Sequence, residues 1–509
     1  MHALTSRRRA VTGLAATAAL VAGALGTTSG AAAAPDAEPP STPVPILTPE
    51  GQISSYVVNV RKVRDPQIRN VRRAIARADG TVVEEWPQIG VFVVHSTSES
   101  FRADVAAEGG DNVASVGATR TTAVLEGTPG QAAGLSARSA RSGVLKAEFA
   151  DTAAEDVVAD PREAEQWDMQ VIKADQAHEI SDGSSDVLVG VLDSGIDHDH
   201  PDLAANIDTT NSVNCTDAGR VDPSATGWHP TTSDHGTHVA GTIAAARNGE
   251  GIVGVAPNAK LASVKVVSDQ GYIYPEFAIC GFMWAGLKGM DVTNNSYYID
   301  PFMYWCGDQP DQAAAMEAVN RAVQWSTGKG VVHAAAAGNA RTDLSNNTTD
   351  TTSPNDSTAV VRTINSGCLD IPAELPGVVT VSSFARTAPT GLDTWLSNFS
   401  NRGLGVIDVG APGSSILSTI VANNGYGLKS GTSMASPHAA GVLALLAGAH
   451  PTWGPTQLAA ALEAQADDKA CSAPQPDPLG RPNPACVGPV TDNSYAGEGM
   501  IDALEAVTP

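Results

Sequence analysis

Basic residues are scarce in this sequence of 509 residues: 31 lysines and arginines stand against 55 aspartates and glutamates, which leaves a net charge of −24. The acidity is uneven. Residues 1–162 hold 16 basic and 17 acidic side chains, whereas residues 163–509 hold 15 and 38. Such a surface repels nucleic acid and anionic membranes. The composition therefore argues against a nucleic-acid-binding protein, and it supplies carboxylates suited to calcium.

Long apolar runs are also missing. Apart from residues 10–26, no stretch approaches the roughly eighteen apolar residues that a membrane-spanning helix needs. That run follows three arginines (7–9) and precedes the small residues 31–34. The pattern predicts that residues 1–34 are a secretory signal peptide, and that the mature protein is secreted without a membrane span. The paired arginines also suit a twin-arginine signal, so both export routes stay open.

Cysteine is sparse, and no two cysteines have the CxxC spacing of a metal site. Six cysteines in a chain expected to be exported instead predict three disulfides. Fifteen pairings are possible, and a proline-rich loop between two of the cysteines favours one of them. In order of preference, the expected pairs are Cys471 with Cys486, Cys280 with Cys306, and by remainder Cys215 with Cys368.

Aromatic residues make up only 5% of the chain, and its apolar content is mainly alanine and valine. Apolar strand-like runs alternate with helix-like segments from about residue 186 onward. This alternation predicts an α/β fold, with a mostly parallel sheet and helices on both of its faces. The length of the chain predicts two or more domains.

One segment makes a specific chemical demand. Residues 431–438 (GTSMASPH) predict a tight turn with Ser433 at the bend, followed by an apolar helical run over 439–450. A serine hydroxyl is a poor nucleophile unless a base removes its proton. The rest of the sequence should therefore supply a histidine, an acid that orients it, and a donor for an oxyanion.

Three other segments supply these groups. Asp193 ends an apolar strand, at the kind of position where the active sites of open α/β sheets gather. His235 opens a helix of small residues. Asn339 follows a third apolar strand, and its side-chain amide can donate to a developing oxyanion.

With the motifs DSGID (193–197), HGTHVAGT (235–242), AAAGN (335–339) and GTSMASPHAAG (431–441), the chain resembles the subtilisin-like serine peptidases, or subtilases. The order Asp, His, Ser is also that of the family. The resemblance covers about residues 163–507 and implies a role for each of four residues. They are Ser433 as nucleophile, His235 as general base and then acid, Asp193 as the orienting acid, and Asn339 as oxyanion donor beside the Ser433 N–H.

The segment before this region has its own pattern. Residues 35–54 are rich in proline and predict a linker. Residues 55–125 alternate in the order βαββαβ, which predicts a small ferredoxin-like α+β module. In order and position it resembles the inhibitory propeptide of subtilases; an unrelated accessory domain is the alternative. Residues 126–162 predict an exposed linker that contains the maturation site, and 163–509 the peptidase domain.

The resemblance implies that two short stretches flank a bound peptide as added strands. They are Gly271, Tyr272 and Ile273, and Ser296, Tyr297 and Tyr298. The second stretch often reads Ser-Leu-Gly in the family, so Tyr298 would crowd or reshape the primary pocket. A restricted processing peptidase therefore fits as well as a broad one. Alternatively, both tyrosines simply pack under the insertion at 299–311.

The resemblance also places two oxygen donors, Asp202 and Asn248, where many subtilases hold a structural calcium. The alternative is that both are ordinary loop residues. Catalysis itself is expected to need no cofactor. His238 and His438 are expected to pack or to form hydrogen bonds behind the site.

Taken together, the sequence predicts a secreted, monomeric serine endopeptidase that acts on proteins or peptides. It would be made as a self-processing zymogen, with its own propeptide as intramolecular inhibitor. An inactive subtilase-like binding protein and an esterase are the competing hypotheses. The presence of Asp193, His235, Asn339 and Ser433 together favours the peptidase.

Overall fold

The computed structural model describes residues 38–126, 159–471 and 484–508. It divides the chain into Met1–Glu38 and Pro39–Pro509, and the second unit contains all the elements below. The predicted signal peptide and most of the predicted maturation linker lie outside the described residues. Within the described ranges, no helix is long and apolar enough to cross a membrane.

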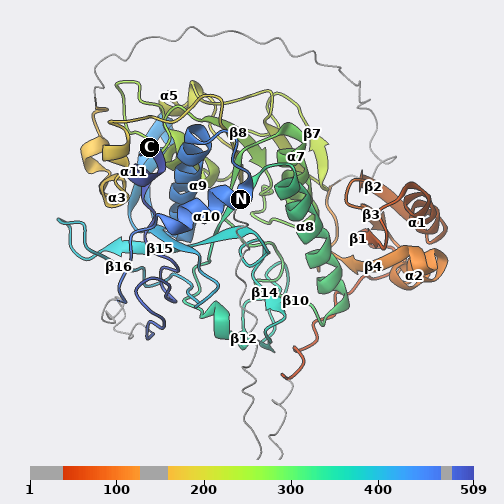
Figure 1. Ribbon diagram of the computed structural model, residues 1–509. Helices are drawn as coiled ribbons and strands as arrows, with labels where there is room; N and C mark the ends of the chain where they lie inside the picture. The colour runs from red at the N-terminus through yellow and green to blue at the C-terminus, as the bar shows by residue number, and fades with distance from the viewer. Residues whose placement is uncertain (1–37, 127–158, 472–483, 509) are drawn as a thin grey trace, which may run out of the picture. The chain divides into compact units, whose positions relative to one another are not determined.

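The amino-terminal part of this unit folds in the order βαββαβ (Figure 1). Its four strands form an antiparallel sheet in the order β2-β3-β1-β4. Helix α1 starts with a proline in its first turn and buries Ile68, Val71 and Ile75, which share one helical face. The elements are β1 (Ser54–Val60), α1 (Asp65–Arg77), β2 (Gly80–Trp86), β3 (Val91–Ser96), α2 (Phe101–Gly109) and β4 (Val113–Ala118).

The rest of the unit is built on a nine-stranded sheet. Its strands follow the order β16-β15-β11-β9-β5-β8-β6-β7, and β17 pairs with β15. The pairs among β15, β11, β9, β5, β8 and β6 are parallel, which confirms the predicted α/β class. The strands are β5 (Leu188–Asp193), β6 (Val213–Asp217), β7 (Arg220–Asp222), β8 (Lys260–Lys265), β9 (Val292–Asn295), β11 (Val332–Ala336), β15 (Val378–Arg386), β16 (Thr394–Leu396) and β17 (Val409–Pro412).

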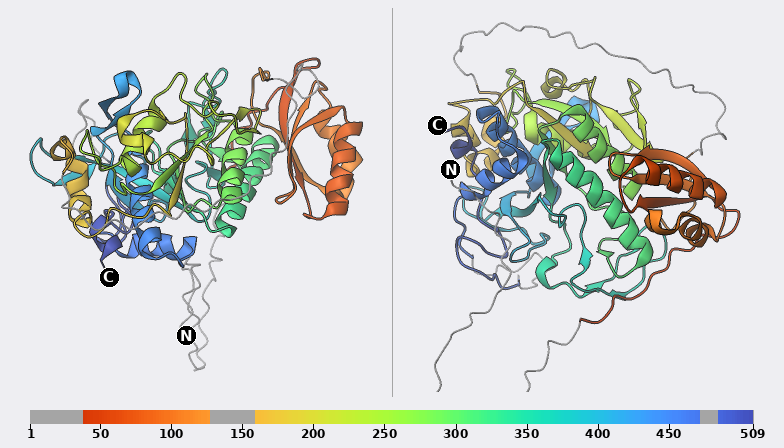
Figure 2. Two further views of the ribbon diagram at one scale, coloured as in Figure 1. Left: turned by 90° about the horizontal axis from the view of Figure 1, so that it is seen from above. Right: turned by 45° about the vertical axis from the view of Figure 1, so that its right-hand side comes forward.

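Helices cover both faces of this sheet (Figures 1 and 2). Along β5, Val189 and Val191 join the core under α6 and α9, whereas Leu192 joins the core under α7 and α8. Alternate residues of a strand point to opposite faces, so one apolar run serves both cores. The main helices are α6 (His235–Ala244), α7 (Pro275–Lys288), α8 (Pro310–Gly328), α9 (Thr432–Ala449) and α10 (Pro455–Ala464).

Shorter elements surround these layers. Helices α3 and α4 lie at the entry to the larger part, and three two-stranded sheets lie outside the main one. The short helices are α3 (Trp167–Val171), α4 (Ala174–Ala177), α5 (Pro201–Ala204) and α11 (Ala503–Val507). The small sheets pair β10 (Trp305–Cys306) with β14 (Cys368–Leu369), β12 (Thr349–Asp350) with β13 (Arg362–Thr363), and β18 (Ile416–Ile420) with β19 (Gly425–Lys429).

The sheet of the amino-terminal module contacts α8. Asn59 Nδ2 on β1 donates to the carbonyl of Ala314 at 2.8 Å. Asp311, in the first turn of α8, accepts the Ala118 N–H at 2.8 Å and pairs with Arg102 at 2.5 Å. Since α1 and α2 pack on the other side, both faces of this small sheet are covered.

Three disulfides join the six cysteines, and two of the predicted pairs are wrong. Cys471–Cys486 forms as expected. The other bonds are Cys215–Cys280 and Cys306–Cys368, in place of Cys280–Cys306 and Cys215–Cys368. The physical reason is tertiary. Strand β6 packs on α7, and β10 and β14 pair with their cysteines directly opposite each other.

Candidate active site

Asp193 and His235 meet at the carboxyl edge of the sheet. Asp193 is the last residue of β5, and His235 is the first residue of α6. A side chain on Gly236 would come within 2.4 Å of the Gly195 carbonyl oxygen, so glycine lets α6 start directly against the turn after β5. As a result, His235 Nδ1 lies 2.9 Å from both carboxylate oxygens of Asp193.

Asp193 and His235 differ in their exposure to solvent. The Asp193 side chain is 2% exposed and the His235 side chain 30%. The Ser194 N–H donates to Asp193 Oδ1 at 2.7 Å, which fixes the carboxylate. Burial lowers the pKa of His235, but the adjacent Asp193 charge and hydrogen bond outweigh it, and the net pKa is raised. Asp193 therefore holds the proton on Nδ1 of the His235 ring, and the part of the ring that faces away from Asp193 is accessible to solvent.

Ser433 is the second residue of α9, just after an extended Gly431. Its Oγ donates to the carbonyl of Ser296 at 3.2 Å, and Ser296 Oγ donates to the Ser433 carbonyl at 2.9 Å. Among the hydrogen bonds of the described residues, none joins Ser433 Oγ to His235. The serine turn is thus held against the stretch that begins at Ser296.

Asn339 is fixed by the same turn. Its Oδ1 accepts the backbone N–H of Thr432 at 2.8 Å and the Thr432 hydroxyl at 3.0 Å. The Thr432 hydroxyl oxygen in turn accepts the N–H of Gly338 at 3.1 Å. Because the amide oxygen of Asn339 is occupied, its NH₂ group is the part that remains to donate to a substrate.

The two predicted substrate-binding stretches lie next to each other. The Ile273 N–H donates to Asp300 Oδ2 at 2.6 Å, and the Asp300 N–H donates to the Ile273 carbonyl at 2.8 Å. Gly271, the first residue of the first stretch, has a φ of +88°. The Tyr272 hydroxyl donates to the Asn355 carbonyl at 3.4 Å.

Both tyrosines of the second stretch are half-buried. The Tyr297 hydroxyl donates to Asn295 Oδ1 at 3.1 Å, and the Tyr298 hydroxyl accepts from Asn355 Nδ2 at 2.9 Å. Burial, and then the charge of Asp193, raises the pKa of Tyr297 well above its ordinary value. Burial likewise raises the pKa of Tyr298 to about 12. Both phenols stay neutral, so neither supplies a base.

His238 and His438 are buried and bonded away from Ser433. His238 Nε2 lies 3.1 Å from the carbonyls of Ile416 and Gly427, and burial lowers its pKa to about 4. His438 Nε2 lies 3.0 Å from Asp168 Oδ2. These contacts agree with packing roles.

Asp202 and Asn248, the predicted calcium donors, also meet. Asn248 Nδ2 lies 3.4 Å from Asp202 Oδ1, and Asp202 Oδ2 accepts the Ile252 N–H at 3.0 Å. The structure adds Asp160, whose carboxylate accepts the Gly249 N–H at 2.6 Å. Burial raises the pKa of Asp160 and of Asp202. Sequence reasoning missed Asp160 because it lies in the segment interpreted as a linker, 42 positions before Asp202.

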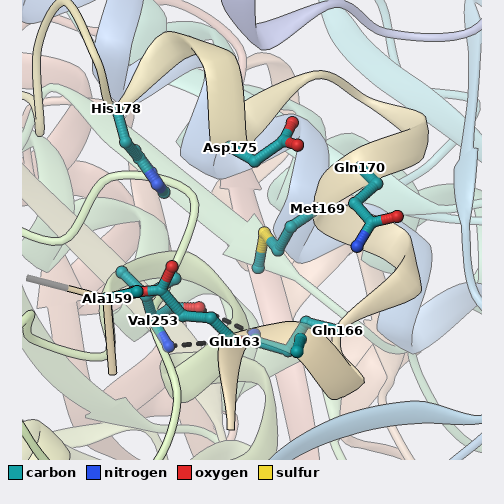
Figure 3. Close-up of a pocket in the computed structure, with 9 residues that line it drawn as sticks. Ala159, Glu163, Gln166, Met169, Gln170, Asp175, His178 and Val253 are labelled. Carbon is teal, nitrogen blue, oxygen red and sulfur yellow. Dashed lines mark hydrogen bonds between the residues drawn. The ribbon is translucent and has the colours of Figure 1, made fainter. Parts of the chain in front are cut away.

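A hollow beside α3 and α4 is lined in part by the neighbours of Asp160 and contains none of the candidate catalytic residues (Figure 3). Gln166 exchanges hydrogen bonds of 2.8 and 3.0 Å with the backbone of Val253 there. None of the candidate catalytic residues is among those that line it, so we assign it no part in the chemistry. The lining residues are Ala159, Glu163, Ala164, Gln166, Met169, Gln170, Asp175, His178 and Val253.

Comparison with known proteins fits this geometry. The model of the subtilase family of S8 peptidases matches residues 184–487, which include all four candidate catalytic positions. The chain belongs to the subtilase family. This subtilase is 36% identical to subtilisin E of Bacillus subtilis over 295 residues, which is 58% of the chain and 64% of subtilisin E. The match thus spans less than two thirds of that relative.

Shorter relatives are covered more fully. The subtilisin of Bacillus pumilus is 36% identical over 295 residues, with 89% of its length matched, and subtilisin Savinase of Lederbergia lenta is 33% identical, with 87% matched. Each alignment covers little more than half of this subtilase, namely 58% and 57%. These relatives therefore correspond to only part of the chain.

Two solved structures resemble a larger share of this chain than those relatives do. Fervidolysin from Fervidobacterium pennivorans, a keratinolytic enzyme related to subtilisin, has a TM-score of 0.62 at 24% identity, over 90% of this chain and 62% of its own. The epidermin leader peptide processing protease of Staphylococcus aureus has a TM-score of 0.62 at 20% identity, over 90% and 98%. At these identities the likeness establishes the fold.

Proposed function

We propose that this subtilase is a serine endopeptidase that hydrolyses peptide bonds through Asp193, His235 and Ser433. The observation that carries the proposal is the 2.9 Å contact between His235 Nδ1 and Asp193 at the carboxyl edge of the sheet. The turn of Ser433 also holds Asn339 by its amide oxygen. Nucleophile, base, orienting acid and oxyanion donor thus come from four separated segments.

The chemistry follows from these positions. The Ser433 side chain rotates from the Ser296 carbonyl toward His235, and its oxygen attacks the peptide carbonyl while His235 Nε2 takes the proton. Asn339 Nδ2 and the Ser433 N–H stabilise the oxyanion. His235 then protonates the departing amine, which leaves an acyl-enzyme on Ser433. A water molecule, deprotonated by His235, releases the acid and restores the serine.

The module of residues 55–125 acts as the intramolecular inhibitor in this proposal. Its buried Arg120 pairs with the fully buried Glu276 of α7 at 2.5 Å. Directly after it, the Thr122 hydroxyl lies 3.4 Å from the Tyr274 hydroxyl, one residue beyond the stretch 271–273. The module's carboxyl end therefore runs beside a segment proposed to bind substrate. Self-cleavage within 126–162 would separate module from enzyme.

Export and a monomeric state belong to the same proposal. The signal pattern at 1–34 supports secretion, and three disulfides suit an oxidising compartment. The acidity of residues 163–509 disfavours nucleic acid as a partner. Its substrates are proteins or peptides.

Calcium is the proposed structural ion, and the residues present fit it. Asp160 and Asp202 offer carboxylate oxygens, and Asp202 forms no ion pair with lysine or arginine in the described residues. Asn248 would add an oxygen only after its amide turns, because its Nδ2 faces Asp202 and its Oδ1 accepts the Glu250 N–H. The ion would supply positive charge between carboxylates and take no part in bond cleavage. Chelation by EGTA should lower the melting temperature of the wild type, and an Asp202→Asn variant should respond little. An equal shift in both proteins would contradict the site.

The enzyme proposal is tested with a fluorophosphonate probe. Wild-type full chain should lose its amino-terminal segment and become labelled at Ser433, and Ser433→Ala should do neither. Mass spectrometry locates the label and the new amino terminus. Unlabelled, uncleaved wild type would instead support the inactive binding protein.

A further inference from the structure

Two acids outside the catalytic groups lie on the segment that follows β14: Asp370 and Glu374, named here the acidic pair. Asp370 follows β14 and is 2% exposed. Glu374 Oε2 accepts the Asp370 N–H at 2.6 Å. Sequence reasoning missed both, because a Leu-Asp-Ile-Pro segment carries no motif for chemistry.

The Asp370 carboxylate lies beside the oxyanion segment. A Cβ placed on Gly338 would lie 3.2 Å from Asp370 Oδ2. Gly338 has a φ of +96° and directly precedes Asn339. Its lack of a side chain therefore leaves the carboxylate facing the backbone that ends β11.

The stretch with the two tyrosines is bonded to the same segment as Asp370. The Ile299 N–H donates to the Ile371 carbonyl at 3.0 Å, which ties this stretch to the residue after Asp370. Burial, then the charge of Asp300, and to a smaller extent that of Asp370 raise the pKa of Tyr298. Asp370 is thus close to the backbone before Asn339, and its segment is bonded to the stretch of Tyr298. In the proposed enzyme, these two segments would flank the side chain on the acyl side of the scissile bond.

Among the residues that the structure describes, no lysine or arginine pairs with either acid of the acidic pair. Asp370 Oδ1 has no hydrogen-bond partner, and within the described ranges neither acid forms an ion pair with lysine or arginine. By contrast, the buried Asp350 pairs with Arg362 at 2.8 Å. Burial, and then the charge of Glu374, raises the pKa of Asp370 well above its ordinary value. A cation brought by a ligand would satisfy this unpaired acid.

We propose that Asp370, with Glu374 beside it, makes this subtilase prefer substrates with lysine or arginine on the acyl side of the cleaved bond. This inference rests on the proposed peptidase function. It favours a restricted processing peptidase over a peptidase of broad specificity. The disulfide Cys306–Cys368 and the β10–β14 pairing hold the segment of Asp370 in place. Tyr298 would then border the aliphatic part of the long basic side chain.

The test compares matched peptide nitroanilides that differ only in the acyl-side residue: Lys, Arg, Leu or Phe. Activated wild type, with active sites counted by fluorophosphonate, should favour Lys or Arg over Leu by about 10²-fold in kcat/KM. Asp370→Asn should bring the ratio to within about tenfold, because kcat/KM falls more on the Lys and Arg peptides than on the Leu peptide. Asp370→Glu should restore part of the preference. Benzamidine should slow labelling of wild type more than labelling of Asp370→Asn.

The control is Glu463→Gln on α10, which neutralises a carboxyl whose pKa burial raises to about 7. It should leave the preference unchanged. The role of Asp370 would be overturned if labelled wild type favoured Leu or Phe, or if Asp370→Asn kept the wild-type ratio. Either result would leave the proposed peptidase function standing. Absence of both labelling and cleavage would overturn the peptidase function, and this inference with it.

Discussion

At the scale of single residues, hydrogen bonds decide which atom of each side chain is offered to a substrate. Asn339 has its amide oxygen engaged twice by Thr432, so the NH₂ group is the available donor. His235 has Nδ1 engaged by Asp193, so Nε2 is the available base. The sequence names these residues, and the bonds assign their atoms.

Asn339→Ala should lower kcat by about 10²–10³ and leave KM nearly unchanged, because the oxyanion forms only after substrate binds. This magnitude is the one found for the oxyanion-hole asparagine of one member of this family. Steady-state kinetics on one peptide substrate measures both constants. The exposed Asn346 offers a matched control, and Asn346→Ala should retain full activity. A rise in KM alone would assign Asn339 to ground-state binding.

The loss of activity at low pH should follow the protonation of His235. The base must be neutral, and Asp193 raises its pKa, so kcat/KM falls as the pH drops through that raised value. Asp193→Asn removes the negative charge. The substitution should shift the fall of kcat/KM to lower pH and reduce kcat by about 10⁴. If kcat/KM of wild type and of Asp193→Asn fell at the same pH, the role of Asp193 beside His235 would be contradicted.

At the scale of elements, the loop after β9 is tied together by a buried acid. Asp300 accepts the Ile273 N–H and the Asn355 amide, both at 2.6 Å, and joins the two stretches proposed to flank substrate. Burial raises its pKa to about 7. An acid with a raised pKa in the folded state binds its proton more tightly there than in the unfolded chain.

Asp300 should therefore stabilise the fold at low pH and lose this contribution as the pH rises. Between about pH 4 and 7, the unfolding free energy of wild type should fall by about 1.4 kcal/mol per pH unit relative to Asp300→Asn, which cannot titrate. Urea unfolding of both proteins across this range gives the difference directly. A constant difference would show that Asp300 does not bind a proton in this range.

At the scale of the whole molecule, the module and the larger part share one fully buried ion pair. Arg120 and Glu276 are 4% and 0% exposed, and the Ser55 hydroxyl also donates to Glu276 at 2.9 Å. Burial opposes ionisation of Glu276, but Arg120 outweighs it and lowers its pKa. Removal of one partner of such a pair costs roughly 3–5 kcal/mol, because a buried charge is left alone.

Arg120→Ala, made in Ser433→Ala full chain to prevent cleavage, should therefore loosen the module. Hydrogen exchange at the amides of β4 and β1 should speed up by at least about 10². Arg72→Ala is the control, because the Arg72–Glu85 pair lies within the module with Arg72 half exposed, and its removal should change exchange little. Equal protection in all three proteins would mean that the pair does not hold the module in place.

The sequence by itself named the candidate catalytic residues and predicted the order of the main elements. Both are local: strand-end and helix-start motifs place Asp193 and His235, and apolar periodicity marks β5 and α9. The tertiary structure alone decided two disulfides, the bonding of Asp160 to the backbone of the Asn248 loop, and the position of Asp370 beside Gly338. These depend on contacts between residues distant in the chain, and no periodicity or spacing encodes which buried neighbour a lone acid or cysteine will meet.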